Sequence, residues 1–165
     1  MKAATVSELK QELSSRSKGE LLELCLHLSK FKKENKELLT YLLYEASNEQ
    51  AYVESVKKEI GILFEEINKR NFYFIKKSVR KILSTTKKHI QYSKKKETEV
   101  ELLLCFCREL KKMRPSINGN ATLKNIYQRQ IEVIKKTILT LHEDLQFDYE
   151  IELNKLSIQA PPVFS

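Results

Sequence analysis

Apolar residues recur every three or four positions through the middle of this chain, and that spacing constrains its fold more than any other feature. It runs from residue 49 to 68 and again from 72 to 92. The spacing places apolar side chains on one side of an α-helix, whereas a strand requires alternation. We therefore predict two amphipathic helices, with apolar stripes formed by Val53, Val56, Ile60, Leu63, Phe64 and Ile67 and by Phe72, Ile75, Val79, Ile82, Leu83, Thr86 and Ile90.

Turn-forming residues are scarce, which favours helices along the whole chain. Only three glycines and three prolines occur in 165 residues, and these residue types supply most tight turns. Capping boxes, in which a side chain and a backbone amide cap each other, are expected at Thr5–Glu8 and Ser17–Glu20. The expected helices cover 6–15, 17–31, 49–68, 72–92 and 97–113, then a long helix from 121 through Leu145 and a short one over 147–156.

Two segments leave alternatives open. Residues 30–36 are polar but contain no glycine or proline, so the helix either continues through them or bends there. Alternating apolar residues from Phe147 to Leu153 suit a strand as well as a helix. The predicted fold is all-α: an irregular multi-helix bundle or a short array of antiparallel helical hairpins, with seven or eight helices. We expect a single helical domain over residues 1–156 and an extended C-terminal tail over 157–165.

Composition narrows the class of protein. With 41% hydrophobic and 32% charged residues, the chain is too apolar to be disordered and too polar to be a membrane protein. The longest mostly apolar stretch, around Leu21–Leu28, is broken by Glu23 and His27 and is far shorter than the roughly 20 residues that a bilayer requires. Cys25, Cys105 and Cys107 form no CxxC pair and fit reduced, mostly buried thiols. No secretory signal is visible, so we expect a cytoplasmic protein with no membrane partner.

The positive charge is concentrated between Lys69 and Lys96. This segment has eleven basic residues and no Asp or Glu, whereas the rest of the chain has 19 basic and 22 acidic residues. The formal net charge of +8 therefore originates in one stretch of the sequence. A surface of this kind favours anionic partners.

Most of these cations are predicted to face solvent. On a helix over 72–92 they lie on an arc centred about 140° from the apolar stripe. Tyr73 lies among them and could stack on an exposed base. The alternative is a solvated face paired with neighbouring acids such as Glu54, Glu65 and Glu66. The predicted anion-binding or nucleic-acid-binding residues are Lys69, Arg70, Tyr73, Lys76, Lys77, Arg80, Lys81, Lys87 and Lys88.

Motifs for catalysis are missing from the sequence. It contains no Gly-rich phosphate loop, no GxSxG motif and no HExxH or ExxH pair. Glu23 and His27 are four residues apart, and His142 adjoins Glu143 and Asp144, but such pairs are common in charged helices. We expect no catalytic residue, no metal site and no cofactor, and therefore a protein that is not an enzyme.

Two patches of sequence resemble a bacterial all-helical family of unknown function. The first is a short Leu-Lys-x-x-Leu helix starting at Leu9, and the second is the basic motif Lys-x-Ser-Val-x-Lys over Lys76–Lys81. The resemblance extends loosely from residue 7 to about 150, and also covers Ser17–Leu21, Lys57–Ile60 and Phe64. It implies a bacterial, cytosolic setting and a basic helix characteristic of the group, but no activity.

The sequence thus predicts a non-enzymatic helical binding module whose basic helix contacts an anionic partner. Nucleic acid is the leading candidate, because a row of cations on a rigid rod can displace counterions from a phosphate backbone. The alternative is a helical protein–protein interaction scaffold, whose basic face docks an acidic protein or a second copy of the chain. An enzymatic role ranks third and would require a deep polar pocket around His27 or His142.

Overall fold

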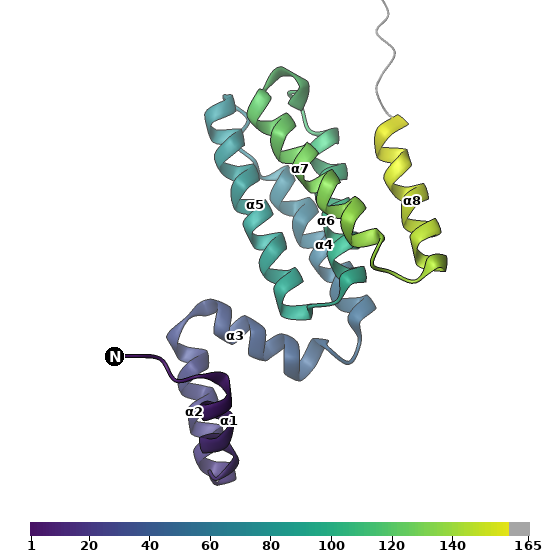
Figure 1. Ribbon diagram of the computed structural model, residues 1–165. Coiled ribbons are helices and arrows are strands. Elements are labelled where there is room, and N and C mark those ends of the chain that lie inside the picture. The colour runs from purple at the N-terminus through teal and green to yellow at the C-terminus, as the bar shows by residue number, and fades with distance from the viewer. Residues whose placement is uncertain (159–165) are drawn as a thin grey trace, which may run out of the picture. The chain divides into compact units, whose positions relative to one another are not determined.

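The computed structural model describes residues 1–158, and all regular structure in that range is helical (Figure 1). The all-α prediction is therefore confirmed. The described residues form eight α-helices: α1 (Val6–Ser14), α2 (Lys18–Phe31), α3 (Lys33–Thr40), α4 (Glu49–Glu65), α5 (Phe72–Ser93), α6 (Lys96–Lys112), α7 (Ala121–Ile138) and α8 (Glu143–Ile158). A π-helical turn, η1 (Tyr41–Glu45), lies between α3 and α4, and a 3-10 turn, η2 (Ile117–Gly119), lies between α6 and α7.

The chain divides into two compact units, Met1–Tyr44 and Glu45–Ser165, where the sequence suggested one domain over 1–156. The first unit contains α1, α2 and α3, and the second contains α4 to α8. The buried side chains of the described helices α4 to α8 supply the second unit with a core of its own.

In the first unit, local hydrogen bonds define the helices. Both predicted capping boxes are present: Thr5 Oγ1 accepts from the amide of Glu8 at 3.3 Å, and Ser17 Oγ accepts from the amide of Glu20 at 3.2 Å. Extended backbone at Lys32 (φ −140°, ψ 149°) separates α2 from α3, so the chain bends there. None of the residues in α1, α2 or α3 is buried.

The second unit is built around α6. Its residues from Leu102 to Cys107 are all buried, as expected for a helical segment that is apolar on every side and covered by neighbouring helices. α6 packs against α4, α5, α7 and α8. The rings of Phe64 and Phe106 join α4 to α6 with centroids 5.5 Å apart. In Figure 1, α4 to α7 stand side by side and α8 lies along one edge of this unit.

The C-terminal helices differ from the sequence prediction. α7 ends at Ile138 instead of continuing through Leu145, which belongs to α8. The break has local causes: the carbonyl of Leu141 accepts from Gln146 Nε2 at 2.7 Å, and His142 Nδ1 accepts from the amide of Asp144 at 3.3 Å. Acidic residues in the first turn of α8 favour a helix start.

The structure of α8 also decides between the helix and the strand that the sequence allowed after Phe147. It is a 16-residue helix, so the alternating residues from Phe147 to Leu153 are helical, and Leu153 and Leu156 are its buried residues. Two residues of the expected extended tail, 157 and 158, belong to this helix. The remainder of that tail lies outside the described residues.

Candidate anion-binding surface

Local sequence signals determine where α5 begins and ends. Asn71 caps its start, because the Asn71 side chain accepts from the amide of Phe74 at 3.2 Å. Lys94 ends the helix in the left-handed conformation, with φ at 58°. The 22 residues between form a rod roughly 33 Å long.

α5 packs against α4 and α6 through its apolar stripe. Ile75 and Val79 are completely buried and Ile82 nearly so, while Phe72, Leu83 and Ile90 lie half-buried at the edges. Thr86, which the stripe includes, is also buried and satisfies its hydroxyl by donating to the Ile82 carbonyl at 2.9 Å. The stripe therefore faces inward, as predicted.

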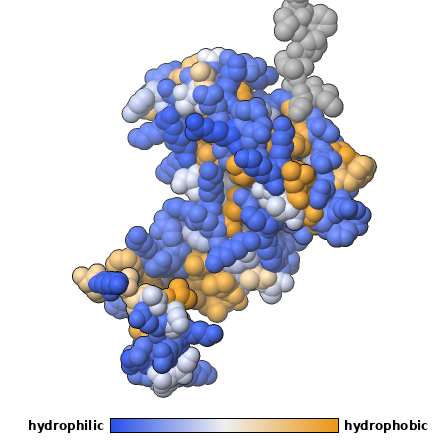
Figure 2. All heavy atoms as spheres, in the orientation of Figure 1, coloured by the Kyte–Doolittle hydropathy of each residue, from blue (hydrophilic) through white to orange (hydrophobic). Residues whose placement is uncertain are grey.

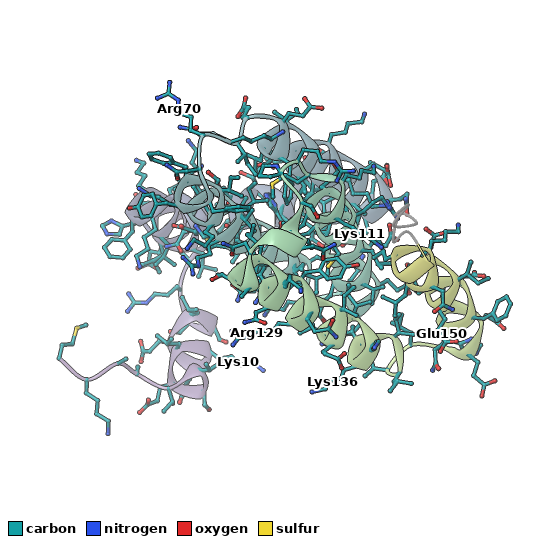
Figure 3. All side chains as sticks on the ribbon, turned by 90° about the horizontal axis from the view of Figure 1, so that it is seen from above. Lys10, Arg70, Lys111, Arg129, Lys136 and Glu150 are labelled. Carbon is teal, nitrogen blue, oxygen red and sulfur yellow. The ribbon has the colours of Figure 1, made fainter. Side chains whose placement is uncertain are left out.

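The cations of α5 lie on the opposite side. We define the basic face as the nine predicted residues on α5 and the link before it. Lys76 and Lys88 are half-buried, and the other seven are exposed; Arg70 extends away from the ribbon in Figure 3. In Figure 2 the side of α5 and α7 turned to the viewer is predominantly hydrophilic. The exposed members are Lys69, Arg70, Tyr73, Lys77, Arg80, Lys81 and Lys87.

Carboxylates do not neutralise most of the basic face. Glu54, expected as a partner, instead binds Lys57 at 2.9 Å, and neither Glu65 nor Glu66 forms an ion pair with α5. Within residues 1–158 seven cations of the face form no ion pair: Lys69, Arg70, Lys76, Lys77, Arg80, Lys81 and Lys87.

The C-terminal end of the basic segment is different, because carboxylates bind its last cations. Lys95 pairs with Glu49 at 3.3 Å, and Lys96 pairs with Glu99 at 3.1 Å. The Glu49 carboxylate also accepts from the hydroxyls of Ser93 and Thr98, which ties the start of α4 to the α5–α6 turn. The open charge therefore lies mainly between Lys69 and Lys87, and Lys94 is a further cation without an ion pair within residues 1–158.

Two exposed aromatic rings stand at the N-terminal end of the face. The side chain of Tyr73 is 65% exposed and that of Phe74 is 39% exposed, and their rings meet edge to face with centroids 5.4 Å apart. Phe74 was not among the predicted site residues. The signal for it was its spacing, since only Phe72 of the three adjacent aromatics falls on the apolar stripe. Exposed rings beside cations suit stacking with nucleic acid bases.

A shallow depression of about 470 Å³ lies on the same helix. Arg80, Lys87 and Lys88 contribute cations to it, and Ser84 and Gln91 contribute neutral hydrogen-bonding groups. Guanidinium and ammonium groups donate to phosphate oxygens. The depression can therefore hold one anionic group.

The histidines have structural partners or lie in open surroundings. His89 joins α5 to α4, because its Nδ1 lies 3.0 Å from the Tyr52 hydroxyl and its Nε2 lies 3.3 Å from Glu59. His27 lines a groove of about 540 Å³ between α1 and α2 that also contains apolar side chains. His142 is exposed and lies 3.6 Å from Asp144.

A polar network outside the basic face joins α4, α6 and α8. The carboxylate of Glu101 accepts from Lys57 at 2.7 Å and from the Tyr149 hydroxyl at 3.1 Å. Burial lowers the pKa of Lys57, but the hydrogen bonds and charges of Glu101 and Glu54 outweigh it and the net shift is upward. Burial, reinforced by Glu101, raises the pKa of Tyr149 well above its usual range. This network fastens α8 to its neighbours.

The described residues form neither a metal site nor a membrane-spanning helix. Within the described residues, no group of three His, Cys, Asp or Glu side chains is arranged to hold a metal ion. Among the helices of residues 1–158, none has the length and apolarity needed to cross a membrane. Of the cysteines, Cys105 and Cys107 are buried as expected, whereas Cys25 is exposed.

Comparison with known proteins gives no relative for this chain: no family model, no curated protein and no solved structure matches it. The likeness to a bacterial helical family stays a prediction based on two short motifs.

Proposed function

We propose that the protein is a helical binding module that contacts the phosphate backbone of a nucleic acid through the basic face of α5. Seven cations without a carboxylate partner carry this proposal: five lie on one side of α5, and Lys69 and Arg70 lie in the link before it. Surface cations usually lie near acids of the same protein, so an acid-free face of this length is available to an external anion.

The dimensions of the face suit a polyanion. Lys76 and Lys87 are eleven residues apart, or roughly 17 Å along the helix axis. That distance equals about five phosphate spacings of one strand, since phosphates follow one another every 3.4 Å or so. The pair of rings at Tyr73 and Phe74 adds two stacking surfaces next to the first cations. A strand with unpaired bases could use both features.

Salt dependence tests the proposal directly. Affinity for a fluorescent duplex and for a single strand of equal length should be measured at two or more salt concentrations. If about six cations meet phosphates, the log–log slope should be near −5. Absence of binding at low salt would contradict the proposal.

Charge reversal identifies the surface. The double variant Lys77→Glu/Lys81→Glu should weaken binding by at least about tenfold at low salt, because it replaces two attractive contacts by repulsive ones. The matched control, Lys58→Glu/Lys136→Glu, changes two exposed lysines elsewhere and carries the same net charge. Circular dichroism should show unchanged helicity for both. Equal losses in the two variants would indicate a general charge effect and reject α5 as the binding surface.

A second candidate function, protein–protein interaction, is favoured by the apolar surface of the first unit. α2 exposes apolar side chains on opposite sides of the helix, including Leu22, Leu28 and Phe31, which are 60%, 60% and 72% exposed. Extensive exposed apolar surface usually marks a site of protein–protein interaction. Chains near 40 residues usually need a further stabilising element, such as oligomerisation. We propose a second copy of the chain as the occupant, because an isologous contact buries the same face on both copies.

Light scattering after size-exclusion chromatography tests this self-association. The expected mass is twice that of the 19.4 kDa chain, falling to one chain in Leu22→Glu/Leu28→Glu. Lys58→Glu serves as an exposed control. A monomer at every protein concentration up to several hundred micromolar, or a dimer unaffected by the leucine changes, would reject this candidate. If a pull-down after nuclease treatment instead recovers a different protein, that protein and not a second copy of the chain is the partner.

A further inference from the structure

A cavity of about 860 Å³ in the second unit gathers a second set of cations, separate from the basic face. α6 ends there, α7 begins there and α8 ends there, so three helices and the link around η2 form its walls. Its volume lies in the range of small-molecule sites, about 300 to 1,000 Å³.

The lining of this cavity is strongly cationic. No carboxylate is among the described residues that line it, whereas five basic side chains are. They come from the end of α6, the following link and one side of α7: Lys111, Lys112, Arg114, Lys124 and Lys135.

Nearby acids compensate only part of this charge. Lys112 pairs with Glu109 and Lys135 pairs with Glu132, each at 3.4 Å and each within one helix. Within residues 1–158, Arg114 and Lys124 form no ion pair. The cavity therefore keeps an excess of positive charge.

Lys111 is held in place by a neutral partner. Its ammonium group lies between α6 and α8 (Figure 3) and donates to the carbonyl of Leu156 at the end of α8. A carbonyl, unlike a carboxylate, leaves the ammonium charge uncompensated. Lys111 is thus a preorganised cation at the wall of the cavity.

The rest of the lining is suited to a planar organic group. Ile117, Ile131 and Leu156 are buried and present apolar surface, and the half-buried ring of Tyr127 lies beside them. Burial raises the pKa of Tyr127 above its ordinary value of 10.0, at which the hydroxyl is already protonated at neutral pH. Three side-chain amides complete the lining: Asn118, Asn125 and Gln128. Gln128 already donates to Glu132 at 3.0 Å, and the other two can donate to and accept from the edge of a base.

From this combination we infer that the cavity binds a nucleoside phosphate. Arg114, Lys111 and Lys124 contact the phosphate, the apolar wall and Tyr127 contact the base, and the amides bond its edge. The same chemistry is found in a free nucleotide and at the phosphorylated end of a strand. The inference does not depend on the proposed function of α5, because none of the residues in this cavity belongs to the basic face.

Titration of the full chain with AMP, followed by amide NMR signals, tests the inference. Signals from residues 111–128 should shift at lower AMP concentrations than any signal of α5, where the depression beside Arg80 offers the phosphate no surface for the base. Adenosine and inorganic phosphate, each lacking one half of the ligand, should bind at least about tenfold more weakly, since each loses one set of contacts. No shift with AMP would overturn the inference, and equal affinity for inorganic phosphate would overturn the nucleoside part of it.

Variants locate the site. Arg114→Glu/Lys124→Glu should reduce AMP affinity by at least about tenfold, and the milder Lys124→Gln should reduce it less. Lys58→Glu/Lys136→Glu, with Lys136 on the outer side of α7 (Figure 3), changes the net charge by the same amount as the double variant and should leave affinity unchanged. If the control weakens binding equally, the cavity is not the site.

A second titration distinguishes a free nucleotide from the phosphorylated end of a strand as the ligand. It uses a 5′-phosphorylated tetranucleotide and its unphosphorylated form with Lys77→Glu/Lys81→Glu, in which binding by the basic face is weakened. Tighter binding of the phosphorylated strand than of AMP assigns a strand end, and affinity equal to that of AMP assigns a free nucleotide. Equal binding of the two strands would overturn the role of the phosphate. If the salt experiment shows that α5 does not bind nucleic acid, the results expected for the cavity do not change.

Discussion

Along α5, single side chains separate cleanly into an inward apolar set and an outward cationic set. Ile75 and Val79 have no exposed surface, while Lys77 and Lys81, two residues further on in each case, are exposed. The apolar side chains stabilise the helix against α4 and α6, so the cations are not needed for folding. Substitution on the basic face should therefore change binding without changing stability.

Tyr149 gives a test at the residue scale that depends on pH. The pKa of Tyr149 is raised from 10.0 and that of Lys57 from 10.5 in the folded protein, so the unfolded chain releases both protons first. The stabilisation is therefore complete below about pH 10 and is lost as pH rises through the folded pKa values. We expect the free energy of unfolding, measured with urea, to stay constant up to about pH 10 and to fall as the pH rises further.

The variant Tyr149→Phe should lose about 1 kcal/mol at neutral pH, because it removes the hydrogen bond to Glu101. It should also show a smaller decrease at alkaline pH, since one of the two coupled groups is gone. Tyr44→Phe, at a 73% exposed position, is the control and should behave as the unmodified protein does. An alkaline decrease of the same size in Tyr149→Phe would show that this hydroxyl does not contribute.

At the scale of single helices, α1 and α2 rely on local interactions more than the helices of the second unit do. Isolated helices shorter than about 12 to 15 residues are marginal in water, and neither α1 nor α2 contains a buried residue. Their capping boxes are therefore a main source of their stability. The hydrogen bond from the backbone of Ser17 is the largest of the influences that lower the pKa of Glu20, as expected for a capping carboxylate.

Removing one cap should consequently unravel the start of α2. Ser17→Ala is expected to cost about 1 kcal/mol of helix stability, seen as reduced helical Cα chemical shifts over residues 18–22. Ser29→Ala is the control, because the Ser29 hydroxyl donates to the Leu26 carbonyl inside the helix and caps no amide. Unchanged shifts in Ser17→Ala would mean that contacts with another surface hold α2.

The helix boundaries show which parts of the fold local sequence patterns predict correctly. Capping boxes and the three-to-four spacing placed the starts of α1, α2 and α5 within a residue. The predicted end of α7 was wrong, because the apolar residues from Leu123 to Leu145 keep their helical spacing across the break between α7 and α8. The side chains that close this turn, Gln146 and His142, act through hydrogen bonds that apolar periodicity does not register.

For the whole molecule, the two units differ in how they are stabilised. Buried side chains of α4 to α8 form the core of the second unit, whereas α1 to α3 contribute no buried side chain. We expect a chain of residues 45–165 to unfold in one cooperative transition with urea, as single domains of this size usually do. Residues 1–44 alone should show weak helicity that rises with concentration if the unit self-associates. A non-cooperative transition for 45–165 would contradict this division.

The sequence by itself determined that the chain is all-helical, where most helices begin, and that its positive charge lies on one side of one helix. These properties depend on residues close together in the chain, through capping, spacing and turn chemistry. The tertiary structure decided that carboxylates leave Lys77 and its neighbours open, and that Arg114 and Lys124 meet around one cavity. Both outcomes depend on which distant side chains come together, and a pattern of neighbours along the chain does not contain that information.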